Sequence, residues 1–219
     1  MAGLLEKDFR LLMQRKQILL LFAVISAIIA FSQDDTDGTF ILSYISACTA
    51  ITLVTTITYD EADNGYQFLM TLPISPKIYV QEKYLFCVVG TTIAWSLSVI
   101  AYFILKTAHG EYFYFLEELP FVITFLFVVF VILSILIPIQ LKYGAEKGRL
   151  VLAVLMGVVF AVIYVIAKIA KKNPEVSKVL KRMDSVNDTI IIAVIAGAGI
   201  LILLLSYIIS RRIMEKKEF

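Results

Sequence analysis

The chain has 219 residues, 60% of them hydrophobic, and a net charge of +2. The apolar fraction exceeds the roughly 45–50% of soluble domains, and a soluble fold of this size could not bury it. The single histidine, His109, excludes a multi-histidine metal site, and the small net charge gives no reason to expect a nucleic-acid partner. We therefore expect an all-α polytopic membrane protein, with residues 1–219 forming a single transmembrane domain.

Windows without Asp, Glu, Lys or Arg predict six membrane-spanning helices. They cover residues 18–32, 39–59, 84–105, 119–141, 150–167 and 189–210. A spanning helix needs about 20 residues, so the first window is short, but Arg15 and Lys16 can extend to the interface and let it span. The same window also fits a signal peptide, although no small-x-small cleavage site follows it.

The distribution of Lys and Arg predicts the orientation. With the N-terminus inside, the inner segments 1–17, 60–83, 142–149 and 211–219 hold 13 basic residues, and the outer segments hold 7. The positive-inside rule therefore places both termini in the cytoplasm. Segment 168–188, with six basic residues, is the exception.

The first residues, 2–16, predict an amphipathic helix lying on the inner leaflet. Leu5, Phe9 and Leu12 share one face, whereas Leu4 falls off it. A solvated N-terminal tail is the alternative.

The second window carries Ser43, Ser46, Thr49 and Thr52, which recur every three residues. These hydroxyls fit either the lining of a translocation path or hydrogen bonds between helices, and both interpretations remain open.

Residues 60–72 predict a short acidic helix between the second and third spans. Gly65, Tyr66 and Leu69 share one face with Ala62, and Asp60 and Asp63 lie on the opposite face. Pro73, after Leu72, ends this helix. We expect the chain to restart with Ser75 as N-cap and Pro76 in the first helical position.

Residues 174–186 predict a basic amphipathic helix at the outer surface. Lys178, Lys181 and Arg182 face away from its apolar side.

Motifs of common enzymes are missing from the sequence: it has no G-x-x-x-x-G-K-[ST], no H-E-x-x-H and no G-x-S-x-G. We therefore do not expect an enzyme.

The stretch from Tyr59 to Leu85 resembles the loop after the second span in permeases of the ABC type-2 exporter family. The matching residues are Glu61, Gly65, Leu72-Pro73-Ile74-Ser75, Tyr79-Val80 and Lys83-Tyr84. Pro76-Lys77 departs from the pattern, because many members carry Arg after the Ser.

This resemblance implies an elbow helix at 2–16, small external helices between spans 5 and 6, and a coupling segment at 60–82. It also implies a separate ATPase subunit, which binds ATP and Mg²⁺ in place of this chain, and a second permease copy, identical or related. The residues implied to meet the ATPase are Asp60, Glu61, Asp63, Gly65, Tyr66, Leu69, Leu72 and Pro73.

The simple layout is similar to bacterial exporters of bacteriocins, lantibiotics and phenol-soluble modulins. It implies an amphipathic or antimicrobial-type peptide as substrate, contact with membrane lipid, and a place in the bacterial plasma membrane. A lipid or hydrophobic-drug exporter, a bacteriocin self-protection protein without transport, and an intramembrane enzyme are the alternatives.

Overall fold

The computed structural model describes residues 1–32, 39–61, 65–71, 74–108, 115–172 and 188–217. The described residues form helices and no strands, which confirms the all-α fold. The helices are α1 (Ala2–Gln14), α2 (Lys16–Ser32), α3 (Thr39–Glu61), α4 (Gly65–Thr71), α5 (Pro76–Ala108), α6 (Phe115–Lys172) and α8 (Asp188–Glu215).

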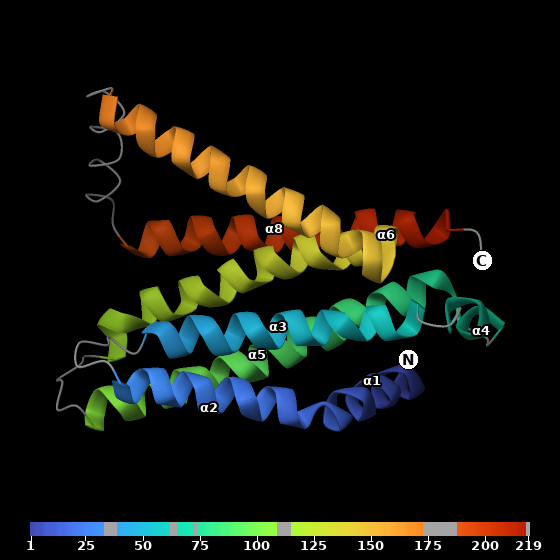
Figure 1. Cartoon of the computed structure of the whole chain (residues 1–219), viewed down its shortest axis with the longest axis horizontal. Helices are drawn as coiled ribbons and strands as arrows, with labels where there is room; N and C mark the ends of the chain where they lie inside the picture. The colour runs from blue at the N-terminus through green and yellow to red at the C-terminus, as the bar shows by residue number, and fades with distance from the viewer. Residues whose placement is uncertain (33–38, 62–64, 72–73, 109–114, 173–187, 218–219) are drawn as a thin grey trace.

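Helix α6 consists of two arms that meet at a break. Its one non-helical residue is Gly144, with φ +71° and ψ −170°, a conformation that favours glycine. The chain reverses there, and the second arm runs back away from the bundle (Figure 1). The predicted windows 119–141 and 150–167 lie on the first and second arm, respectively.

The chain is a multi-pass membrane protein. Among the described residues, four helical segments are long and apolar enough to cross a membrane: Phe40–Glu61, Pro76–Ala108, Glu118–Gly144 and Ile192–Glu215. Helices α1 and α2, bent by 56°, bring the number to five if they form one span. Large side chains such as Leu20, Leu97 and Leu201 are exposed on the bundle, as expected of a surface in contact with lipid. Six spans remain a prediction.

The core lies between α3, α5, α6 and α8. Its fully or nearly fully buried side chains include Leu53 and Ile57 of α3, Tyr79 of α5, and Leu133 and Ile137 of α6. Both chain termini, α4 and the reversal of α6 lie at one end of this bundle (Figure 1). We call this end of the bundle the terminal end.

The structure confirms one predicted boundary at the terminal end and corrects one predicted exposure. Helix α5 begins at Pro76, and the Ser75 hydroxyl accepts a hydrogen bond from the Ile78 amide at 3.3 Å, as expected of an N-cap. Of the predicted helix over 60–72, the described residues 60–61 and 65–71 are helical, the first two as the end of α3 and the rest as α4. Asp60, expected on an exposed acidic face, is instead buried.

Candidate functional site: a buried charge cluster beside an apolar cavity

A buried charge cluster lies at the terminal end, where α1, α3 and α5 meet. Its members are Lys7 and Asp8 on α1, Asp60 on α3, and Glu82 and Lys83 on α5. The side chains of Asp8, Glu82 and Lys83 are fully buried, Asp60 is nearly so, and Lys7 is 31% exposed. The cluster therefore joins three helices that are far apart in the sequence.

Two lysines bridge two aspartates within this cluster. The Lys83 ammonium donates a hydrogen bond to Asp8 and lies 2.7 Å from Asp60 Oδ2. The Lys7 ammonium donates to Asp60 and lies 3.3 Å from Asp8 Oδ1. The Tyr79 hydroxyl donates to Asp60 Oδ2 at 2.9 Å. Because each aspartate meets both cations, the contacts hold α1 against α3 and α5.

Burying these charges is favourable only while all of them are present. A buried ion costs several kcal/mol to desolvate, and its partners offset that cost. Glu82 is the least satisfied member. Within the described residues, neither of its carboxylate oxygens has a hydrogen-bond partner, and Lys83 Nζ is 4.0 Å away. The charges of the cluster therefore depend on one another, because the loss of one charge leaves its partners buried without a counter-ion.

The sequence analysis missed this cluster. Glu82 and Lys83 directly precede the third apolar window, and Asp8 lies within the N-terminal helix, next to Phe9 of its predicted apolar face. The one available signal was Lys83, a motif residue of the family resemblance. On the same helix, Leu4, which falls off the predicted apolar face, is buried against the bundle together with Asp8, whereas Phe9 on that face is 57% exposed.

The residues predicted to meet an ATPase lie in different environments in the structure. Asp60, expected on an outward acidic face, is buried in the charge cluster, so that expectation is corrected. Tyr66 and Leu69 are buried and join the core. A Cβ at Gly65 would lie 2.5 Å from the Asp60 carbonyl oxygen, so glycine is required by local packing. Asp63, Leu72 and Pro73 lie outside the described residues.

Helix α4 is linked to the charge cluster through aromatic contacts. The rings of Tyr66 and Tyr79 meet edge to face, with centroids 5.8 Å apart. Burial is the main cause that raises the pKa of Tyr66, and the nearby Glu61 and Asp60 carboxylates act in the same direction. Tyr66 therefore remains a neutral hydroxyl, and its ring connects α4 to the residue that donates to Asp60.

A second polar contact joins the C-terminal end to the same region. Lys217 Nζ lies 3.5 Å from Glu61 Oε1, donates to the Leu141 carbonyl at 3.3 Å, and lies 4.3 Å from the Tyr66 ring centre. The Glu61 carboxylate also packs against Gly144, where a Cβ would clash with both of its oxygens. The ends of α3 and α8, the reversal of α6, and α4 therefore meet around Lys217.

The hydroxyl side chains that recur every three residues along α3 mainly form hydrogen bonds. Ser43 and Thr52 donate to carbonyls of their own helix, at 3.1 and 2.8 Å. Ser46 bonds its own helix and also lies 3.3 Å from the Ser98 hydroxyl of α5. Of the four predicted path residues, Thr49 lines a cavity. The contacts of Ser46 therefore favour hydrogen bonding between helices, whereas Thr49 faces the cavity.

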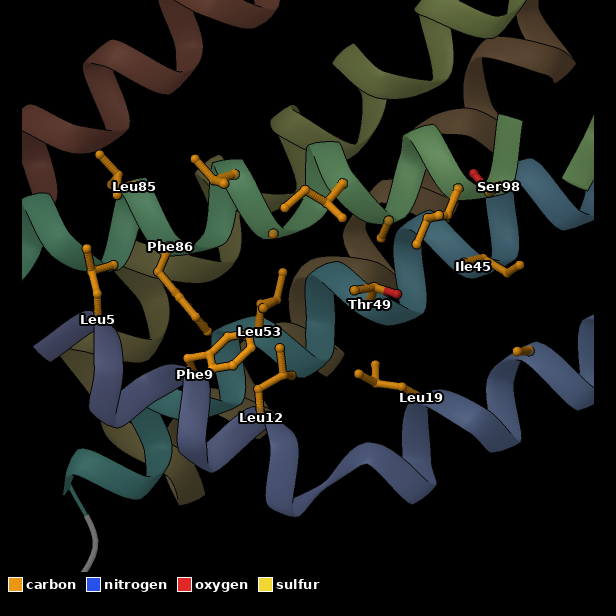
Figure 2. Close-up of a pocket in the computed structure, with 16 residues that line it drawn as sticks. Leu5, Phe9, Leu12, Leu19, Ile45, Thr49, Leu53, Leu85, Phe86 and Ser98 are labelled. Atoms are coloured by element: carbon orange, nitrogen blue, oxygen red, sulfur yellow. The ribbon is translucent and has the colours of Figure 1, made fainter. Parts of the chain in front are cut away.

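That cavity lies between α1, α2, α3 and α5 and measures about 570 Å³. Leu5, Phe9 and Leu12 of α1 close it at one side, facing Phe86 and Leu53, and Leu19 borders it from α2 (Figure 2). Nearly all its lining is aliphatic or aromatic. The three elbow residues predicted from the sequence therefore share one role, which is to form a wall of the cavity.

Two predictions lie outside this site. Lys178, Lys181 and Arg182 of the predicted outer helix fall outside the described residues. Within the described part of the chain, no group of His, Cys, Asp or Glu side chains is arranged to hold a metal ion.

Comparison with known families gives one match that covers nearly the whole chain. The model of a family described as "ABC-2 family transporter protein" matches residues 3–215. The comparisons with curated proteins and with solved structures gave no match.

Proposed function

Because the chain belongs to the ABC-2 family of transporter proteins and is the membrane component of an ABC transporter, we propose that it is the permease of an ATP-driven exporter. A separate ATPase subunit supplies the energy by docking at α4. The link from α4 to the buried charge cluster supports this most strongly, because it joins a short helix at the bundle end to three long helices.

The contacts suggest how a push on α4 would travel. Tyr66 passes displacement to Tyr79 and so to Asp60, which is held by both lysines of the cluster. Lys217 passes it to α6 and α8. Closely packed, ion-paired elements move together and do not deform gradually, so the unit acts as a rigid connection. ATP and Mg²⁺ act in the ATPase subunit.

The cargo we propose is an amphipathic or antimicrobial-type peptide that leaves the inner leaflet of a bacterial plasma membrane. The exposed apolar helix faces and the scarcity of charge along α2 and the middle of α3 suit a cargo that partitions into lipid. Two copies of the permease would form the path, with both termini in the cytoplasm. A lipid or a hydrophobic drug is the alternative cargo.

A pair of matched substitutions tests the docking site. Thr71, at the end of α4, and Thr107, at the end of α5 remote from the bundle end that carries α4, are both exposed. Thr71→Arg places a bulky cation on the proposed contact surface, whereas Thr107→Arg makes the same change elsewhere. We expect Thr71→Arg to abolish copurification of the ATPase while the permease keeps its thermal midpoint, and Thr107→Arg to retain the complex.

The same complexes, reconstituted in nanodiscs, test the cargo. An amphipathic helical peptide should stimulate ATP hydrolysis in the wild type and in Thr107→Arg, and a scrambled peptide of equal composition should not. Normal copurification and stimulation with Thr71→Arg would rule out docking at α4. Equal stimulation by both peptides would favour the lipid or drug alternative.

A further inference from the structure

Two exposed cations lie beside the apolar cavity, at the bend between α1 and α2. Helices α1 and α2 meet at the 56° bend, and the bend carries Arg15 and Lys16, both exposed. Leu12 and Leu19, on either side of the bend, both line the cavity (Figure 2). The cations therefore lie between the two stretches of α1 and α2 that line the cavity.

The chemistry of the lining selects the kind of molecule that fits. Its polar side chains are Thr49 and Ser98, and the Ser98 hydroxyl already donates to the Trp95 carbonyl at 2.8 Å. An extended peptide inside would leave its amides and carbonyls without partners, at a cost for each group. A hydrocarbon chain has no such groups and loses nothing on entry.

The length of the cavity also matches a lipid chain. Its lining on α5 extends from Leu85 to Ser98. At about 1.5 Å per residue this stretch is about 20 Å long. Half of a hydrocarbon core of about 30 Å is roughly 15 Å. One acyl chain of a single leaflet would therefore fit within the length of the cavity.

The two cations determine the headgroup. Lys7 and Lys83, the other cations near this wall, are engaged by Asp8 and Asp60. Among the described residues, Arg15 and Lys16 form no ion pair, and the Arg15 guanidinium lies 5.1 Å from the Tyr59 ring centre. Cations at the edge of an apolar site attract a phosphate-bearing headgroup.

We propose that the cavity binds one acyl chain of an anionic membrane phospholipid, with the lipid phosphate held by Arg15 and Lys16. The site takes a lipid that stays with the protein, and it is distinct from the α4 surface. It does not depend on which cargo the transporter moves.

Delipidated protein in detergent, titrated with phosphatidylglycerol or phosphatidylethanolamine of identical chains and measured by native mass spectrometry, tests the headgroup. The double variant Arg15→Gln/Lys16→Gln should weaken phosphatidylglycerol binding roughly tenfold or more and phosphatidylethanolamine binding by less, because the ammonium of phosphatidylethanolamine offsets the charge of its phosphate. The matched control Arg211→Gln/Arg212→Gln removes two cations from α8 at the same bundle end and should bind as the wild type. Equal binding by the Arg15/Lys16 variant and the wild type would overturn the proposal.

The chain site is tested by filling the cavity. Ala23→Phe projects a ring from α2 into it and should abolish retention of either lipid, whereas Val24→Phe changes a neighbouring side chain that is 55% exposed and outside the lining. Leu97→Trp fills the cavity from α5 if Ala23→Phe does not fold. Wild-type lipid retention in a folded filled variant would refute the site. Absence of bound lipid in the wild type, together with loss of peptide-stimulated ATP hydrolysis in a filled variant, would assign the cavity to cargo instead.

Discussion

Replacing Lys83 by Met removes the central cation of the buried charge cluster and keeps an unbranched side chain that is one heavy atom shorter. Asp8 and Asp60 would then lose the ammonium that contacts both of them. Breaking a buried ion pair by removing one partner costs about 3–5 kcal/mol. Lys7 still contacts Asp60 and lies 3.3 Å from Asp8, so we expect the lower end of this range, about 3 kcal/mol.

A buried thiol next to the cluster reports this loss directly. Cys87 follows Lys83 by one helical turn and is fully buried, and Cys48→Ala leaves it as the only thiol of the chain. A maleimide labels Cys87 only when this region opens. At about 1.4 kcal/mol per tenfold change, Lys83→Met should accelerate labelling roughly hundredfold.

The matched control is Lys77→Met. Lys77 is 56% exposed and lies 3.9 Å from Glu215, and a surface pair of this kind contributes about 0–1 kcal/mol. Its labelling rate should therefore stay within about fivefold of the wild type. Adding Asp8→Asn to Lys83→Met removes one stranded carboxylate and should slow labelling again. If Lys83→Met is labelled at the rate of the control, the cluster does not clamp α1, and the reasoning fails.

Two further substitutions probe the other contacts at the terminal end. Gly144→Ala forces a Cβ into a backbone with φ +71° and into the Glu61 carboxylate, so the thermal midpoint of unfolding should fall by several degrees. The control is Gly157→Ala: Gly157 has open space around it, so this substitution should leave the thermal midpoint unchanged or raise it. Tyr84→Phe removes hydrogen bonds of 2.6 and 2.8 Å to two serine hydroxyls of α8 and should cost about 1–3 kcal/mol, measured by the same thermal scan. The control is Tyr207→Phe, because the ring of Tyr207 packs edge to face against Tyr84. This substitution should cause no comparable loss of stability. A Gly144→Ala or Tyr84→Phe midpoint equal to that of its control would contradict these assignments.

Local patterns in the sequence predicted the helices well. Charge-free windows mark apolar helices because lipid-facing and core-facing positions are both hydrophobic, and Ser75-Pro76 marked the start of α5 because capping depends on adjacent residues. The exposed acidic face expected at Asp60 was wrong, because periodicity cannot show that Asp60 finds its partners on α1 and α5.

The charge cluster and the cavity were beyond prediction for the same physical reason. Asp8 and Lys83 are 75 positions apart, and nothing near Asp8 shows that a lysine will cover it. The burial of Leu4 and the exposure of Phe9 depend on how α1 rotates against the bundle, which is determined by these distant ion pairs. The cavity exists because the bend at Arg15 holds α1 against α5 while α2 stays apart from it.

The pairing of Asp8 with Lys83 also has a consequence for biogenesis. A chain is made from its N-terminus, so Lys7 and Asp8 leave the ribosome long before Lys83. Until α5 has been synthesised and inserted, the Asp8 carboxylate lacks its main counter-ion and must remain in water. Helix α1 is therefore first in the sequence but docks late, and a chain interrupted before Lys83 would present an undocked N-terminus.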